Sequence, residues 1–403
     1  MRFFSAALLF LGLSFAATAQ PMASIEPLPA AEPAPPTGAA PLGLKADKPP
    51  RRFSILPVPV LFYQAETGLG YGLGGLLSGK FGDDTTTRAS NIRAQFWTTQ
   101  KKQSLLQLVH TVFTPGEKYY LNGEISAYDI LLFYYGTGNN TRSQDESSQA
   151  YKLLIFNQRV QKQLANKLFG GVMYRYTRVK DIKAEGFTEG GAPNIFLTDP
   201  RVSPAERQDH QTSLLGPVLT YDTRDNVLST FTGSYLDVSA MLGGLGLGSD
   251  YRFARYQVDA RHFRPLLGSN KTILALQAVG QFHTGDVPFR ELAGIGANFG
   301  GTLYNNANIM RGIYEQRFRD RQMAAVQAEV RRKLIGRVDA AVFGAAGQTG
   351  YKVTDFDASG MKYAGGAGLR FNFIRRDRVN LRLDYAAGSG GFSGLYFFIG
   401  EAF

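Results

Sequence analysis

Apolar and polar residues alternate with a period of two along several segments of the chain between residues 53 and 403. In the segment 251–263 one set of alternate positions is polar and the other is apolar, the apolar set being Ala254, Tyr256, Val258 and Ala260. The segments 271–283, 323–334 and 379–385 repeat this pattern. Successive side chains of a strand point to opposite faces, so the pattern predicts β-strands of about 8–14 residues with one apolar and one polar face.

The connections between these segments differ in length in a regular way. Short turns are expected at 114–118, 164–167, 335–337 and 375–378, and long loops at 131–149, 181–210, 284–322 and 349–361. With both chain ends on one side of the sheet, the short turns fall on that side and the long loops on the other. Any single strand of this kind also fits a half-buried strand of a soluble β-sandwich. About sixteen such strands favour an all-β fold, a transmembrane antiparallel β-barrel, because bacterial outer-membrane barrels combine even strand numbers with long external loops.

Composition favours strands over helices as the membrane-spanning elements. Hydrophobic residues make up 44% of the chain and the mean hydropathy is −0.16. After the N-terminal segment, no stretch approaches the roughly 20 apolar residues that a spanning helix needs. A barrel fits these values because half of each strand faces an aqueous lumen. The 46 glycines suit tight turns, and the 20 tyrosines and 29 phenylalanines suit aromatic girdles at the membrane surfaces.

The positive charge of the chain points to the inside of the barrel. The formal net charge is +11 at pH 7, but Lys and Arg are scattered singly along strands and turns. We therefore expect a basic lumen. A nucleic-acid partner is not expected, because no motif of the required kind is present.

The N-terminal residues have the pattern of an export signal. Met1 and Arg2 precede an apolar stretch at residues 3–15, and Ala17-Thr18-Ala19 supplies the small residues that a signal peptidase reads. This predicts a signal peptide at residues 1–19, cleaved before Gln20. A membrane anchor is the alternative, but the apolar stretch is too short to span. The chain has no cysteine, which excludes a lipoprotein anchor, disulfides and thiolate sites.

Residues 20–52 are rich in Pro and Ala, so we expect a disordered periplasmic tether ahead of a barrel at residues 53–403. The chain ends on an aromatic-rich segment that includes Phe397, Ile399 and Phe403. A last strand that ends in Phe resembles the signal by which bacterial barrels are inserted into the outer membrane. Glu401 interrupts the apolar parity of this strand. The expected partners are outer-membrane lipid and, during biogenesis, the barrel assembly machinery.

Several short motifs resemble one family. Tyr221-Asp222-Thr223-Arg224-Asp225-Asn226, followed by Gly233-Ser234-Tyr235-Leu236, resembles the D-x-R-D-N turn of BamA/TamA-type outer-membrane assembly factors, the bacterial surface antigen superfamily. Met310-Arg311-Gly312-Ile313-Tyr314 is similar to the V-R-G-[F/Y] tip of the sixth external loop in that superfamily. Gln327-Ala328-Glu329-Val330-Arg331 and Phe343-Gly344-Ala345-Ala346-Gly347 resemble two of its wall strands.

The resemblance implies a site inside the lumen. The long sixth loop is expected to fold into the barrel, where Arg311 would pair with Glu329 on the wall. Ala345 stands where the family has an aspartate, so one of the two expected acidic partners of Arg311 would be missing. Typical members carry periplasmic POTRA domains, and the roughly thirty residues between Gln20 and Arg52 are too few for one. The sequence therefore predicts a barrel-only member of the superfamily.

The sequence leaves two classes of function open. One is an assembly or translocation barrel that passes client polypeptide, or lipid, through a weak seam between its first and last strands at the outer membrane. The other is a passive pore or a structural surface protein. A seam would show as sparse hydrogen bonding between about residues 58–63 and 395–403, and a pore as a continuous lumen past Arg311.

An enzyme is not expected, and neither is a metal or another cofactor. The four histidines, His110, His210, His262 and His283, are far apart in the sequence, and none has a serine two positions on, which would place it on the same face of a strand. Asp209-His210 has no matching acidic pair. No nucleophile and base are therefore brought together by the sequence pattern.

Overall fold

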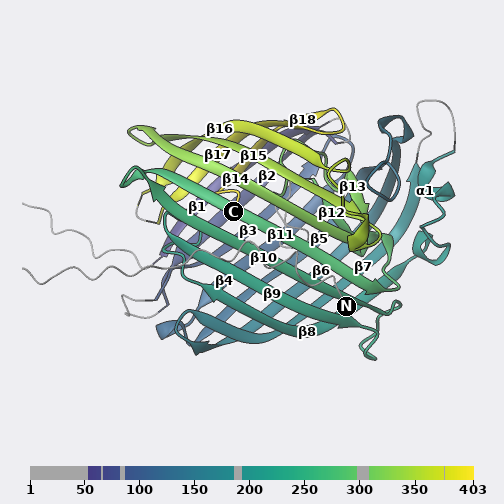
Figure 1. The fold of residues 1–403 in the computed structure, drawn as a ribbon, viewed down its shortest axis with the longest axis horizontal. Helices are drawn as coiled ribbons and strands as arrows, with labels where there is room; N and C mark the ends of the chain where they lie inside the picture. Colours follow the sequence, from purple (N-terminus) through teal and green to yellow (C-terminus); the bar gives the residue numbers. More distant parts are fainter. Residues whose placement is uncertain (1–52, 65–66, 82–86, 186–192, 297–307, 376) are drawn as a thin grey trace, which may run out of the picture. The chain divides into compact units, whose positions relative to one another are not determined.

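The structure is a computed structural model, and it describes residues 53–64, 67–81, 87–185, 193–296, 308–375 and 377–403. The predicted signal peptide at 1–19 and the predicted tether at 20–52 lie outside the described residues. The described part is a barrel of sixteen antiparallel strands in chain order (Figure 1). Each strand pairs with the next one along the wall.

The wall strands are β1 (Phe53–Gln64), β2 (Gly68–Gly79), β3 (Ser90–Thr99), β4 (Ser104–Phe113), β5 (Tyr119–Tyr134), β6 (Ser147–Ala165), β7 (Leu168–Glu185), β8 (His210–Asp222), β9 (Gly233–Gly243), β10 (Phe253–Leu266), β11 (Ser269–Gly285), β14 (Gln322–Ile335), β15 (Val338–Gly350), β16 (Lys362–Ile374), β17 (Val379–Gly388) and β18 (Phe392–Ile399). Two short strands, β12 (Ala293–Ile295) and β13 (Phe318–Asp320), form a separate pair within the connection from β11 to β14.

Helical structure is confined to connections in the described residues. It comprises α1 (Ile195–Thr198) and the 3-10 turns Pro115–Glu117, Ser143–Asp145, Ala205–Arg207, Phe289–Glu291 and Val353–Asp355. No helix of the described residues is long and apolar enough to cross a membrane.

The strands extend further than the alternating pattern predicts. β6 starts at Ser147 and β5 ends at Tyr134, so the connection between them is shorter than the predicted loop 131–149. Backbone pairing continues there because Tyr134 pairs with Ser147 and Phe133 with Ser148. We call the end of the barrel with the short connections the turn end, and the end with the long connections the loop end. The sixth connection at the loop end is described at 286–296 and 308–321, and these residues are called the sixth loop.

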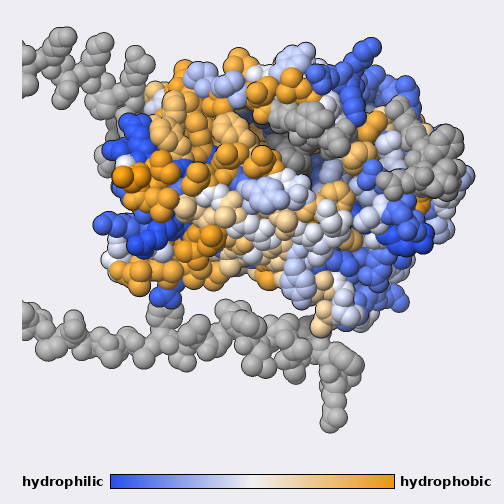
Figure 2. Space-filling view, turned by 90° about the horizontal axis from the view of Figure 1, so that it is seen from above, coloured by the Kyte–Doolittle hydropathy of each residue, from blue (hydrophilic) through white to orange (hydrophobic). Residues whose placement is uncertain are grey.

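The two faces of the wall have opposite chemistry. Outward positions carry exposed apolar side chains such as Leu106, Val172, Leu219 and Val326. Figure 2 shows apolar residues over much of the visible wall, with hydrophilic residues toward its ends. Many inward positions are buried and polar, although some, such as Leu105 and Ile155, are apolar. Among the largest fully buried side chains of the wall and the sixth loop are six arginines: Arg175, Arg311, Arg317, Arg319, Arg370 and Arg382. The lumen therefore holds polar groups and the surface holds apolar ones, as a barrel in lipid requires.

Candidate functional site

The sixth loop lies inside the barrel, where Arg311 contacts the wall. Arg311 is only 2% exposed. Its Nη2 donates to Glu329 on β14 (2.5 Å) and its Nη1 donates to Asp384 on β17. The guanidinium also lies over the Phe343 ring of β15, 3.5 Å from the ring centroid. The loop is thus held to three wall strands through one side chain.

The second carboxylate does not come from the expected position. The resemblance implies that Ala345 replaces an acidic partner of Arg311. In the structure, Asp384 is the second acidic partner of Arg311. Ala345 packs instead against the apolar cluster around Met310 and Ile313. Asp384 lies on the polar parity of β17, so the signal was present in the sequence. The sequence alone did not show that β14 and β17 bring Glu329 and Asp384 to the same guanidinium, that of Arg311.

The residues beside Arg311 fix the backbone of the loop. Gly312 has φ +103°, and a Cβ there would lie 2.6 Å from the backbone of Ala387 on β17. Its N–H donates to the Tyr396 hydroxyl of β18 (2.9 Å). Only glycine fits both the left-handed backbone and this close approach. Met310 and Ile313 on either side are fully buried.

Tyr314 joins the sixth loop to other loop-end segments. Its hydroxyl accepts a hydrogen bond from the N–H of Phe133 (3.2 Å). Its ring centroid lies 5.6 Å from that of Phe392, at the start of β18, and the Tyr135 ring contacts both rings edge-on. The five motif residues from Met310 to Tyr314 therefore contact the wall and the loop end together.

Glu329 and Asp384 belong to a larger cluster, which we call the latch cluster. Its members are Arg311, Arg331, Arg370, Arg382, Glu329, Asp384 and Glu401. Arg331 Nε donates to Glu329 (2.7 Å) and Arg370 Nε donates to Glu401 (3.1 Å). Because these groups are buried, loss of any one partner leaves an uncompensated charge.

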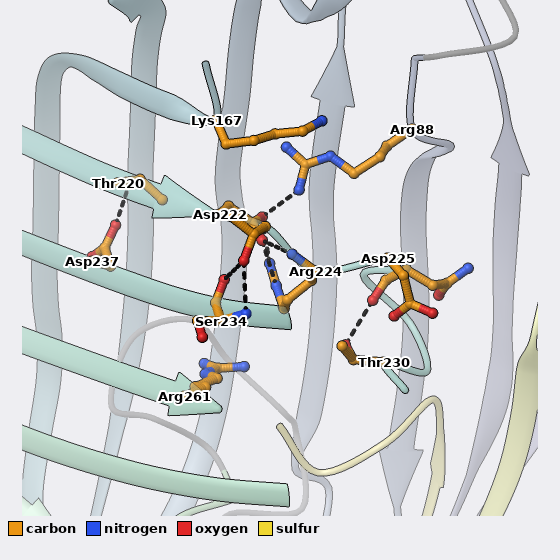
Figure 3. A network of polar contacts seen from close by, with 12 residues as sticks. Arg88, Lys167, Thr220, Asp222, Arg224, Asp225, Thr230, Ser234, Asp237 and Arg261 are labelled. Carbon is orange, nitrogen blue, oxygen red and sulfur yellow. Dashed lines mark hydrogen bonds and ion pairs between the residues drawn. The ribbon is translucent and has the colours of Figure 1, made fainter. Parts of the chain in front are cut away.

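The turn end carries a second polar network, shown in Figure 3. Arg88 Nε donates to Glu117 (2.8 Å), and its Nη1 forms an ion pair with Asp222 (2.7 Å). Asp222 also accepts from Arg224 Nε and Nη2, both at 2.9 Å. Lys167 adds a third cation beside Glu117 (3.2 Å). The first Asp and the Arg of the D-x-R-D-N motif are thus partners of each other.

Residues 223–232, which we call the fourth turn, contact strands far along the wall. Asp225 forms an ion pair with Arg378 before β17 (2.5 Å), and Asn226 Nδ2 donates to the carbonyl of Asp377 (3.3 Å). Leu228 packs in an apolar cluster with side chains of β1 and β17. The turn therefore connects the β8–β9 side of the turn end with the β17 side.

The C-terminal tail, Gly400–Phe403, turns into the lumen. β18 ends at Ile399, and Gly400 has φ +88°. Phe403 packs with Phe263 of β10 and Ala275 of β11, and its carbonyl oxygen accepts from Arg331 Nη2 (3.0 Å). The expected aromatic strand ending in Phe403 therefore stops four residues earlier, because Gly400 redirects the backbone.

The three residues of the predicted insertion signal consequently lie in different environments. Phe397 is exposed on the outer wall, Ile399 is half-buried, and Phe403 is buried in the lumen. Glu401 does not interrupt an outer face either. It lies inside the barrel with Arg331 and Arg370, and it accepts from Asn380 Nδ2 (2.6 Å).

The first and last strands have features of sheet edges. β1 contains Pro57 and Pro59, which have no N–H to donate, and β18 has only eight residues. Proline is confined to edge strands and bulges in sheets. The backbone pairings of the described residues run from β1 to β18, and none of them joins β18 to β1. Side chains of Leu56 and Val58 nevertheless pack with Val379 and Ile399.

The described residues bring one serine and one histidine together. Ser234 on β9 pairs across the strands with His262 on β10, and its Oγ lies 2.9 Å from His262 Nδ1. The sequence argument missed this pair because it considered only neighbours along one strand. Leu236 and Leu276, the outward neighbours of the pair, are exposed and apolar. Within the described residues, no group of three or more His, Asp or Glu side chains is placed to hold a metal ion.

Comparison with known proteins places these features in context. The description "Omp85 superfamily domain" matches residues 79–403. BamA from Haemophilus ducreyi lacking POTRA domains 1-3 is similar in structure, with 14% identity and a TM-score of 0.51 over 87% of this chain and 70% of that chain. A comparison with curated proteins gives no match.

Two CdiB structures are also similar. CdiB from Acinetobacter baumannii has 12% identity and a TM-score of 0.52, over 86% of this chain and 59% of that chain. CdiB from Escherichia coli has 10% identity and a TM-score of 0.54, over 87% of this chain and 63% of that chain. The chain thus spans less than two thirds of either CdiB. At these identities the likeness concerns the fold.

Proposed function

The chain belongs to the Omp85 superfamily, and from this premise we propose that it is a bacterial outer-membrane barrel that inserts or translocates client polypeptide, or lipid, through the seam between β1 and β18. Its partners would be outer-membrane lipid and, during its own biogenesis, the barrel assembly machinery. The chemistry is that of binding and release, with no covalent step.

The observation that carries this proposal is the composition of the two seam strands. Pro57 and Pro59 remove two hydrogen-bond donors from β1, and the eight residues of β18 offer few backbone groups to pair with it. With these groups missing, β1 and β18 pair weakly and the seam can open, and the unpaired N–H and C=O groups that remain are those with which an incoming strand would pair. Every other wall strand has ten residues or more in the described part.

The sixth loop supports the same proposal because some of its contacts lie on the last two strands. Gly312 approaches Ala387 of β17 and donates to Tyr396 of β18. Arg311 binds Asp384 of β17 as well as Glu329 of β14. Movement of the loop would therefore reach β17 and β18, one side of the seam.

A cysteine cross-linking experiment tests the seam. The chain has no cysteine, so pairs can be introduced one at a time between β1, from Ile55 to Leu61, and β18, at Leu395, Phe397 and Ile399. The oxidised protein is placed in lipid vesicles with an unfolded outer-membrane barrel as client, and folded client is measured by its heat-modifiable mobility. We expect a seam disulfide to lower client insertion several-fold and a reductant to restore it.

The control is a disulfide between two strands that are already paired. Leu383 of β17 faces Phe397 of β18 in register, so the pair Leu383→Cys with Phe397→Cys adds a cross-link without closing the seam. This control should insert client as well as the reduced protein does. Equal insertion by the seam-locked and control proteins would refute the seam as the route.

The passive pore is the second candidate, and the contents of the lumen disfavour it. The sixth loop, the fourth turn and the C-terminal tail all place side chains inside the barrel. A passive pore needs a continuous path past these groups. Conductance measurements in planar bilayers test this candidate.

A further inference from the structure

The lumen contains a partly open cavity between the sixth loop and the turn end. Its volume is about 200 Å³, and it is bordered by the sixth loop at Asn308, by the fourth turn at Arg224 and by the tail at Phe403. We call it the lumen chamber. At about 30 Å³ for each water molecule it could hold roughly six waters, or one small polyatomic ion with some water.

Arg382 of β17 borders this chamber with unused hydrogen-bond donors. The side chain is 1% exposed. Its Nη2 donates to Asn308 (2.9 Å), whereas Nη1 and Nε have no hydrogen-bond partner. The nearest carboxylate, Asp384, is 3.6 Å from Nε and is shared with Arg311 and Arg370. A buried donor without a partner costs about 1–3 kcal/mol, and more when it is charged.

Arg382 also lies beside a second cation. It faces Arg370 directly across the β16–β17 pair. Two guanidinium groups that face each other repel, and an anion next to Arg382 would offset this repulsion.

Arg93 and Asn91 of β3 border the chamber on the far side of the seam from Arg382. Arg93 forms no ion pair within the described residues, although the charge of Glu124 acts on it. The Asn91 side chain is buried. The other lining arginines differ, since Arg159 pairs with Asp237 and Arg261 with Asp259.

We propose that the lumen chamber binds a phosphate group, with Arg382 and Arg93 as its cationic ligands and Asn91 as a neutral donor. The guanidinium fork matches the oxygens of phosphate, and the negative charge would offset the repulsion between Arg382 and Arg370. The bound group would link β3 to β17 from inside the barrel. This inference does not depend on the insertion role.

Equilibrium dialysis of the full-length protein in neutral detergent against radiolabelled inorganic phosphate tests the proposal. Thermal unfolding is followed in parallel by heat-modifiable mobility, in phosphate and in chloride at equal ionic strength. We expect saturable binding of one phosphate and a rise in Tm of several degrees, because a ligand that binds only the folded state stabilises it. Arg382→Gln and Arg93→Gln should each weaken binding at least tenfold and abolish the Tm shift.

The variants are chosen so that misfolding cannot imitate the result. Arg93→Gln removes a guanidinium that forms no ion pair, so its barrel should fold and give a clear answer even if Arg382→Gln does not. Arg178→Gln changes an exposed arginine on the outer wall of β7 and should bind phosphate like the wild type. Absence of binding by the wild type, or equal binding by Arg93→Gln and Arg178→Gln, would overturn the proposal.

Two sources of the phosphate group are separated by the ligand used. If the natural source is free phosphate, inorganic phosphate alone gives the full effect. If it is a lipid headgroup, vesicles of phosphatidylglycerol raise Tm more than phosphatidylcholine vesicles do, and Arg93→Gln removes the difference. Either result supports the chamber as the site. A phosphatidylglycerol effect that persists in Arg93→Gln would assign lipid binding to the outer wall and count against the chamber.

Discussion

Arg311 is the residue on which the position of the sixth loop depends. It is buried against Glu329 and Asp384. Arg311→Ala is expected to destabilise the barrel by about 3 kcal/mol, the lower end of the range for breaking a buried pair, because Arg331 and Arg370 still pair with Glu329. The measurement is denaturant unfolding in detergent, together with proteolysis of the sixth loop.

A double-mutant cycle with Glu329→Ala separates this pair from its surroundings. We expect a coupling of about 1–3 kcal/mol between the two substitutions, as for residues in one buried network. Arg142→Ala is the control, since Arg142 and Asp145 form an exposed ion pair at the loop end. Strictly additive effects of the Arg311 and Glu329 substitutions would mean that the pair does not latch the loop.

Gly312 gives a second prediction for the same loop. Gly312→Ala places a methyl group within 2.6 Å of the Ala387 backbone, so the loop must move away from β17. We expect proteolytic cleavage of the loop to rise at least tenfold. The control is Gly246→Ala, because Gly246 also has positive φ (+76°) but has open space around it and should lose only about 1–2 kcal/mol from backbone strain. Equal loop cleavage in the two variants would contradict the proposed contact.

The sequence could predict the pairing of two motif residues in the sixth loop and on the wall. Arg311 and Glu329 were identified through a resemblance, and the structure brings them together. Asp384, Phe343 and Tyr396 were not identified as their neighbours. Strand parity shows which face a residue takes, but it does not show at which height two distant strands bring their side chains together.

Strands were predictable where one face is clearly apolar, because a period of two belongs to no other regular element. Their ends were less predictable. β6 continues through Gln149 and Tyr151, where inward residues are partly polar and partly aromatic. The end of β18 depends on the backbone of Gly400, and no apolar pattern reports a change of direction at a single glycine.

Phe403 is expected to act during insertion of the barrel itself. Deletion of Phe403 should lower the fraction of heat-modifiable, membrane-inserted protein and leave periplasmic material open to proteolysis. In the barrel, the same deletion removes the contact with Phe263 and the carbonyl that Arg331 binds. Phe371→Ala, which removes an exposed ring from the outer wall of β16, is the control. Normal insertion after the deletion would rule out Phe403 as the recognition residue.

The turn-end network should make the barrel sensitive to acid. Burial by itself raises the pKa of the Glu117 carboxyl, but the hydrogen bonds and charge of Arg88 outweigh burial, and the pKa lies below its ordinary value. A carboxyl with a lowered folded-state pKa stabilises the fold above its unfolded pKa of about 4.3, and this contribution is lost as the pH falls through the folded value.

Glu117→Gln removes the group that titrates. We expect the wild-type barrel to lose stability between about pH 4.3 and the lower folded-state pKa, and the variant to be less stable at pH 7 but flatter across that interval. Asp145→Asn, in an exposed pair at the loop end, is the control. Identical pH profiles for the wild type and Glu117→Gln would exclude this network as an acid-sensitive element.

The segments inside the lumen predict a low ion conductance for the whole barrel. Because the sixth loop, the fourth turn and the tail lie inside, the wild-type protein in planar bilayers should show small or rare conductance steps. Arg311→Ala, by releasing the loop, should increase the mean conductance several-fold. Steady large steps from the wild type, unchanged in Arg311→Ala, would favour the passive pore.

The position of the sixth loop inside the wall also has a consequence for the folding pathway. Its contacts have a high contact order, since Tyr314 and Phe133 are 181 positions apart and Arg311 and Asp384 are 73 apart. Such contacts form slowly because distant parts of the chain must first meet. The loop cannot bind Asp384 or Tyr396 until β17 and β18 are in place. Binding of the sixth loop is therefore a late step of folding. The rate at which the loop becomes protected from protease should equal the rate at which the folded protein accumulates.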